Sequence, residues 1–159
     1  MTRLSLKGIF HPEEREKIDY RALMCVLMGE RFQHIHEIIC PALESGKIVI
    51  SDRYIFTMIA TMHARDYSNE KWVYDLCKHI IKPDRTFLLD VPYELAEHRI
   101  RQRREWKDAY VEKNHLVRCQ TEFRKLLDET DMIRIDTSDL NPLKAFSDIE
   151  KHLHLLIFR

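Results

Sequence analysis

The sequence predicts an α/β fold in which a parallel β-sheet carries helices on both faces. Three short apolar runs, each followed within two residues by an aspartate, are the main evidence. Residues 48–50 precede Asp52, residues 86–89 precede Asp90, and residues 132–135 precede Asp136. Apolar runs of this length are typical of strands that are buried on both faces. Because helical patterns separate the runs, the sheet is predicted to be parallel.

Between these runs, apolar residues recur at helical spacing. The first such pattern extends from about residue 19 to residue 44, with Gly29 as a possible break and Pro41 as a possible kink. Gly46 is expected to end this pattern. Further helices are predicted over residues 54–64, 68–81, 92–104, 110–129 and 142–156, and a short apolar pattern over residues 2–10 is expected to form one helix end.

The composition indicates one globular domain over residues 1–159. Its 26 basic and 26 acidic residues balance, which gives no general affinity for nucleic acid or anionic membranes. A hydrophobic content of 45% excludes a wholly disordered chain. Four widely spaced cysteines are expected to be buried thiols in a reducing compartment, not a disulfide framework. With no apolar run long enough to span a membrane and no signal peptide, the expected location is the cytoplasm.

The three aspartates that follow the predicted strands are the first candidate site. The carboxyl ends of parallel strands share one sheet edge, where ligands bind in open α/β folds. Asp52, Asp90 and Asp136 would then gather along that edge. The alternative is that each aspartate simply starts a loop or caps a helix, and the sequence leaves both interpretations open.

A basic run from Arg99 to Lys107 is the second candidate. Arg99 and Arg103 lie four residues apart and share one face of the predicted helix, whereas Arg101 points elsewhere. Cations near a helix C-terminus are common and mildly stabilising, so a solvated helix end is one interpretation. The other is a cluster of guanidinium groups that bind phosphates.

Considered together, these motifs resemble the thymidylate kinases, a family of nucleoside-monophosphate kinases with a P-loop fold. Asp52-Arg53-Tyr54 matches the family's Asp-Arg-aromatic motif, directly after a Val-Ile-Ser strand. The resemblance also includes five other parts of the chain besides the arginine-rich run: Arg31, residues 39–47, residues 82–84, residues 88–92 and residues 135–138. It covers nearly all of the chain, and its specificity lies in the ordered set of motifs.

The resemblance implies a role for each matched residue. Arg53 would hold the acceptor phosphate, Asp52 would organise the phosphoryl or magnesium side, and Arg31 would hydrogen-bond the acceptor base. Arg99 and Arg103 would be catalytic lid residues over the donor phosphates. The substrate-binding set would also include Leu27, Tyr54 and Thr57, and Asp136 and Thr137 would bind the donor nucleotide. The implied cofactors are ATP and Mg²⁺, and the implied assembly is a homodimer.

The sequence departs from the family pattern in two places. No G-x-x-x-x-G-K-[ST] motif is present: Gly46-Lys47 is the one Gly-Lys pair, Pro41 stands where the first glycine is needed, and Ile48 follows the lysine. The expectation is therefore an incomplete domain that lacks the N-terminal strand and phosphate loop. In the second departure, Leu27 stands where the family usually has a phenylalanine that stacks on thymine.

The leading hypothesis is phosphoryl transfer from ATP to a nucleoside monophosphate, dTMP to dTDP, with low activity in this chain by itself. The alternative is a non-catalytic remnant of the kinase fold that binds nucleotides or dimerises. A third hypothesis, nucleic-acid binding through residues 99–107, has less support because the chain has no net charge.

Overall fold

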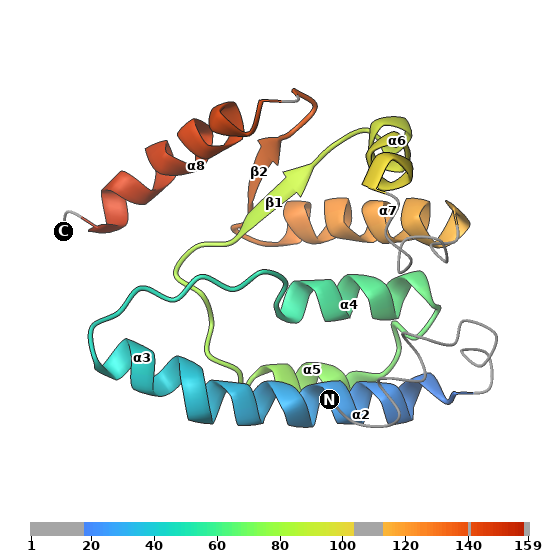
Figure 1. Ribbon diagram of the computed structural model, residues 1–159. Helices are drawn as coiled ribbons and strands as arrows, with labels where there is room; N and C mark the ends of the chain where they lie inside the picture. The colour runs from blue at the N-terminus through green and yellow to red at the C-terminus, as the bar shows by residue number, and fades with distance from the viewer. Residues whose placement is uncertain (1–17, 104–112, 140, 158–159) are drawn as a thin grey trace. The chain divides into compact units, whose positions relative to one another are not determined.

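The computed structural model describes residues 18–103, 113–139 and 141–157 (Figure 1). These residues form two compact units. The first unit contains the described residues up to Ile55 together with Asp66–Lys82, and the second contains Phe56–Arg65 and the described residues from Pro83 onward. The patterns predicted at residues 2–10 and 110–112, and most of the basic run after Arg103, lie outside the described residues.

Helix α2 (Tyr20–His34) opens the first unit. It begins at Asp19, whose side chain accepts a hydrogen bond from the backbone N–H of Arg21 and so satisfies one of the unpaired donors of the first turn. The helix runs through Gly29 without the possible break. Its buried face is formed by Tyr20, Met24 and Met28. Leu27, which falls within the predicted helical pattern of residues 19–44, is exposed, because apolar residues occur all around this helix and the periodicity does not single out one face.

The helix continues as a π-helical turn, η2 (Ile35–Ile39), and then as α3 (Cys40–Glu44). Within the turn, the N–H of Cys40 bonds to the carbonyl of Ile35, five residues earlier. Pro41 follows directly: it has no N–H to donate, and its ring would clash with the carbonyl four residues before it. The possible kink at Pro41 therefore takes the form of one widened turn in a continuous helical run.

Gly46 ends α3, as predicted. Its φ of +74° is a left-handed conformation that glycine adopts without steric cost, and the Gly46 and Lys47 N–H groups bond back to the carbonyls of Leu43 and Ala42. The strand predicted at residues 48–50 is wrong. This segment does not form a strand, and Ile48 and Ile50 are 74% and 91% exposed. An apolar run indicates that a segment can be buried, but a strand also needs a neighbouring strand to hydrogen-bond with. Residues 48–50 have no such neighbour among the described residues.

Helix α5 (Lys71–Cys77) completes the first unit and is shorter than predicted. Glu70, which precedes it, accepts hydrogen bonds from Arg21 Nε at 2.6 Å and from Trp72 Nε1 at 2.7 Å. Arg21 also lies over the ring of Tyr67, 5.3 Å from its centroid. These contacts join the start of α5 to the start of α2.

The second unit is built on two parallel strands, β1 (Phe87–Asp90) and β2 (Ile133–Asp136), which confirms two of the three predicted strands. Their register pairs Phe87 with Ile133 and Asp90 with Asp136. The helices of this unit also match their predicted positions: α4 (Ile55–Ala64, all but its first residue), α6 (Tyr93–Arg103), α7 (Lys113–Glu129) and α8 (Pro142–Ile157).

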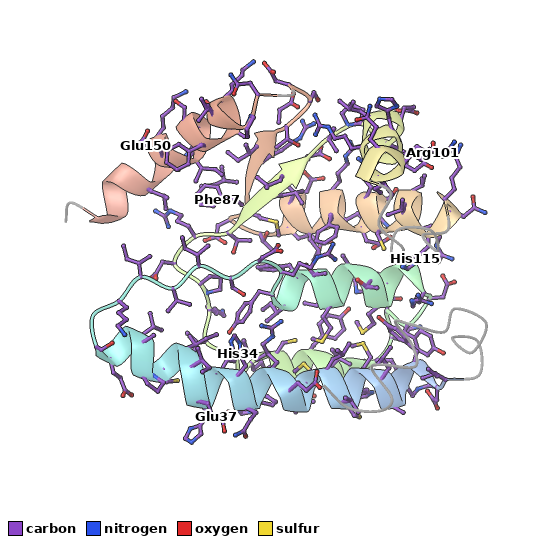
Figure 2. The ribbon with its side chains drawn as sticks, viewed as in Figure 1. His34, Glu37, Phe87, Arg101, His115 and Glu150 are labelled. Carbon is purple, nitrogen blue, oxygen red and sulfur yellow. The ribbon has the colours of Figure 1, made fainter. Side chains whose placement is uncertain are left out.

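Helix α8 contacts β2, and Phe87 of β1 faces α8, with its ring centroid 6.3 Å from that of His152 (Figure 2). Helices α4 and α7 are joined by His63 and Glu122, whose Nδ1 and Oε2 atoms are 3.1 Å apart. The buried apolar side chains of this unit are those of Ile59, Ala60, Met62, Ala64, Leu126, Met132 and Ile135.

The four cysteines are free thiols, which agrees with the prediction that they form no disulfide framework. The expectation that they are buried is wrong: Cys25 is exposed, since it lies off the buried stripe of α2, and the other three are partly exposed. Within the described ranges, none of the helices has the length and apolar character needed to cross a membrane.

Candidate functional site

Arg31 and Tyr54 come together in the first unit. Arg31 lies near the C-terminal end of α2, one turn after Leu27. Its guanidinium carbon lies 4.8 Å from the centroid of the Tyr54 ring, a cation–π arrangement. The Tyr54 hydroxyl donates a hydrogen bond of 3.0 Å to the carbonyl of Ile81. Burial raises the pKa of Tyr54 above its ordinary value, which itself lies well above neutral pH, and the protonated hydroxyl is the donor in this bond.

Asp52 and Arg53, next to Tyr54, are both exposed. Arg53 has a φ of 63°, which is uncommon for a residue with a β-carbon. The Ser51 hydroxyl bridges this turn, donating to the carbonyl of Arg53 at 3.0 Å. Such strain costs on the order of 1–3 kcal/mol and is concentrated at functional sites. The turn presents an exposed guanidinium and an exposed carboxylate beside the stacked pair of Arg31 and Tyr54.

In the second unit, Asp90 is buried at the carboxyl end of β1, only 4% exposed. Its carboxylate accepts hydrogen bonds from Arg134 Nε at 2.8 Å and from Arg124 Nη2 at 3.3 Å. Gln120 Nε2 lies 3.3 Å from the other oxygen. Burying a carboxylate is unfavourable unless it is paired, and two guanidinium groups provide that pairing here.

Asp136 and Thr137, at the end of β2, belong to the same edge. Thr137 donates twice to the carbonyl of Asp90, from its backbone N–H at 2.9 Å and from its hydroxyl at 3.0 Å. Hydrogen bonds from Ser138, first from its side chain and then from its backbone, lower the pKa of Asp136. Arg99 of α6 donates from Nη2 to the carbonyls of Thr137, Ser138 and Asp139. The arrangement brings four predicted residues together: Asp90, Arg99, Asp136 and Thr137.

The remaining predicted residues are placed as follows. Thr57 is half-buried on α4, and its carbonyl accepts the hydroxyl of Thr61. Arg103 is the last residue of α6, and its side chain lies outside the described part of the structure. Asp52 belongs to the first unit and the sheet to the second, so the structure places two of the three aspartates, Asp90 and Asp136, side by side.

The partners of Asp90 were not identified from the sequence. Gln120 and Arg124 are four residues apart on α7, so they share a helix face, and Arg134 lies between two apolar residues of β2. A charged residue in the middle of an apolar strand is unusual enough to have indicated a buried partner. The identity of that partner depends on the register of β1 and β2, which the sequence does not specify.

A family model for thymidylate kinase matches residues 4–147. The chain belongs to the thymidylate kinase family.

Several curated members of the thymidylate kinase family are similar to this chain. It is 34% identical over 139 residues to a protein of Thermococcus gammatolerans named "Probable thymidylate kinase", a match that covers 86% of this chain and 64% of the relative. A protein of the same name from Thermococcus kodakarensis is 41% identical over 88 residues, which is 55% of this chain and 42% of the relative. The "Thymidylate kinase" of Chlamydia trachomatis serovar D is 40% identical over 93 residues, with coverages of 55% and 45%. The chain thus spans less than two thirds of the length of these relatives.

Proposed function

We propose that this protein transfers a phosphoryl group from ATP to a nucleoside monophosphate, with dTMP as the acceptor and dTDP as the product. The observation that carries the proposal is the arrangement of Arg31, Tyr54 and Arg53 in the first unit: one guanidinium is stacked on an aromatic ring, and a second is exposed on a strained turn beside it. Membership of the thymidylate kinase family supports the same activity.

On the acceptor side, Arg53 binds the phosphate of the monophosphate and Arg31 hydrogen-bonds the base. A guanidinium suits both tasks, because its planar set of donors matches phosphate oxygens and base edges. Stacking on Tyr54 restricts the Arg31 side chain before the substrate arrives, which lowers the entropy lost on binding. Leu27, one turn earlier on the same helix, is exposed and cannot stack on a base as an aromatic ring does. We therefore expect weak discrimination among pyrimidine monophosphates.

On the donor side, the proposal assigns ATP to Asp136 and Thr137 at the carboxyl end of β2, the usual place for ligands in parallel sheets. Arg103 remains a proposed lid residue of α6. In the described ranges no group of three or more His, Cys, Asp or Glu side chains could hold a metal ion. The proposal assigns the Mg²⁺ contact to Asp52, an exposed carboxylate of the first unit, as the family resemblance implies. When bound, Mg²⁺ neutralises charge on the transferring group.

The alternative is a non-catalytic protein that binds nucleotides, and one sequence observation favours it: the 159 residues contain no G-x-x-x-x-G-K-[ST] motif. In phosphate loops of this kind, backbone N–H groups cradle the phosphates. We therefore expect turnover by this chain alone to be slow.

An assay of ADP release with ATP and dTMP, combined with calorimetric titration of dTMP, separates the two functions. If the protein is a kinase, ADP release requires dTMP and is lost in Arg53→Ala. The matched control, Arg85→Ala, should retain it, because Arg85 is exposed and bonds to the adjacent Asp84 carbonyl. Binding of dTMP without dTMP-dependent ADP release would favour the non-catalytic alternative, and neither binding nor release would contradict both.

The proposal also includes one thymidylate kinase-like domain that forms a homodimer in the cytoplasm. Two exposed apolar side chains along the run from η2 to α3 support the dimer: Ile38 and Leu43. Ile38→Glu is expected to shift the sedimentation of the protein toward the monomer. An unchanged sedimentation coefficient would argue against this face as the interface.

A further inference from the structure

One nitrogen of Arg99 contacts three consecutive backbone carbonyls. Its Nη2 atom lies 2.8 Å from the oxygen of Thr137, 3.2 Å from that of Ser138 and 3.3 Å from that of Asp139. Arg99 belongs to α6, and the three carbonyls belong to the loop that leaves β2, 38 to 40 residues later in the chain. The contact therefore joins a helix to a loop that is distant in sequence.

The local structure of this loop explains why it needs such a donor. The Asp136 carboxylate accepts the N–H of Ser138, and the Asp139 carboxylate accepts the N–H of Asn141. These two Asx turns satisfy backbone N–H groups and leave the carbonyls between them to be satisfied by other donors. A guanidinium can satisfy them because it carries several N–H donors and a full charge, which strengthens each hydrogen bond.

The loop is also anchored to the sheet at its first residue. Thr137 uses both of its donors on the carbonyl of Asp90, and the Asp90 side chain is fixed in turn by Arg134 and Arg124. The loop is thus attached to β1 by Thr137 and to α6 by Arg99. Without Arg99, the attachment to the helix would lose its charged donor.

We propose that Arg99 is a positioning residue that fixes the loop of residues 137–139 for the donor nucleotide. It acts through the loop and makes no direct contact with the donor phosphates. This inference rests on the proposed function for the assignment of the donor nucleotide to Asp136 and Thr137. It revises the role implied by family resemblance, in which Arg99 is a lid residue over the donor phosphates.

Hydrogen exchange tests the positioning role without any nucleotide. In Arg99→Ala, we expect the amides of Thr137 and Ser138 to exchange at least about tenfold faster, because a charged hydrogen-bond donor is lost. The Leu89 amide of β1 should be unchanged, which shows that the sheet remains folded. Arg99→Lys, which retains a cationic donor, should restore much of the protection. The matched control is Arg101→Ala, since Arg101 is exposed on the same helix (Figure 2). Its side chain pairs with Glu97.

If exchange at Thr137 and Ser138 is the same in Arg99→Ala and wild type, the positioning role is wrong. If the Leu89 amide exchanges faster by the same factor as the amides of Thr137 and Ser138, the positioning role is also contradicted, because the substitution would then have loosened the whole unit.

Titration with ATP and with adenosine tests how Arg99 affects the donor. A residue that acts through the loop should weaken both ligands by a similar factor in Arg99→Ala, since the loop is shared. A direct phosphate contact would instead weaken ATP and leave adenosine unchanged, and that result would overturn the inference. If wild-type protein binds neither ligand, the proposed donor site fails, whereas the exchange experiment still decides whether Arg99 orders the loop.

Discussion

The guanidinium of Arg31 lies over the ring of Tyr54 at 4.8 Å, and the hydroxyl of that same tyrosine is bonded to the Ile81 carbonyl. The Tyr54 side chain thus contacts Arg31 through its ring and the Ile81 backbone through its hydroxyl. The ring orients Arg31, and the hydroxyl fixes the ring. Two substitutions of Tyr54 separate these contributions.

Tyr54→Phe keeps the ring and loses the hydroxyl. We expect it to lower the free energy of unfolding by about 0.5–1.5 kcal/mol, the typical contribution of one hydrogen bond. Its affinity for dTMP should stay close to that of wild type. Tyr54→Leu also loses the stack, worth about 0.5–1 kcal/mol at an exposed site, so its affinity for dTMP should fall a few-fold further. Urea denaturation and calorimetry measure the two effects. Equal dTMP affinity in the two variants would show that the ring does not orient Arg31.

The positive φ of Arg53 leads to a prediction about stability. Arg53→Gly removes the β-carbon that makes this conformation unfavourable, whereas Arg53→Ala retains it. We expect the glycine variant to be more stable than the alanine variant by about 0.5–1 kcal/mol in urea denaturation. Both should lose dTMP-dependent turnover. If the alanine variant is the more stable of the two, the turn at Arg53 is not strained.

Two glycines should respond in opposite directions to the same substitution. A β-carbon at Gly29, inside α2, would meet no heavy atom within 4 Å apart from its chain neighbours and the backbone of its own helix. Gly29→Ala should therefore stabilise the protein by about 0.5–1 kcal/mol through better helix propensity. Gly46 also has free space around it, but its φ is +74°. Gly46→Ala should therefore destabilise the protein by about 1 kcal/mol. Thermal melts of the two variants provide the comparison, and a shift of both in one direction would contradict the assigned conformations.

The contact between α4 and α7 should depend on pH. Hydrogen bonds from Lys125 and then from His63 lower the pKa of Glu122. Because the pKa of Glu122 is lower in the folded state, the charged carboxylate stabilises the fold fully at any pH above its ordinary pKa of about 4.3. This stabilisation is lost as the pH falls through the lower pKa of the folded state. We expect Glu122→Gln to be less stable than wild type at pH 7, by up to about 1 kcal/mol, with the difference shrinking below about pH 4.

Glu150→Gln is the matched control for this measurement, because Glu150 is exposed on α8 (Figure 2). Its urea midpoint should follow that of wild type at every pH. If the difference in free energy of unfolding between wild type and Glu122→Gln at pH 7 persists unchanged at pH 3.5, the charge of Glu122 is not the cause of that difference.

The sequence predicted the α/β class, two of the three strands and the positions of most helices, because those features depend on local patterns. Residues 86–90 and 132–136 read as strands and form β1 and β2. The same reasoning was wrong for residues 48–50, where an equally apolar run is exposed. The two cases differ because β1 and β2 each have a neighbouring strand to pair with, and a local sequence pattern does not show whether such a neighbour is present. The π-helical turn before Pro41 was missed for a similar reason, since its hydrogen bonds respond to one proline and not to a repeating pattern.

For the candidate site, the sequence identified the residue types more successfully than their contacts. It singled out Arg31 and Tyr54, which the structure brings together, and Asp90, Asp136 and Thr137, which share one edge. It did not indicate that Arg99 binds backbone carbonyls, because the shape of the loop at residues 137–139 follows from two Asx turns and the strand register. Contacts of this kind depend on tertiary geometry.

The central claim, an acceptor-phosphate site at Arg53, is tested most directly by calorimetric titration of dTMP and of thymidine into wild type and Arg53→Ala. Thymidine carries the same base without the phosphate. We predict that wild type binds dTMP more tightly than thymidine, and that Arg53→Ala binds dTMP at least about tenfold more weakly while its affinity for thymidine is unchanged. Equal affinity of wild type and Arg53→Ala for dTMP would contradict the claim.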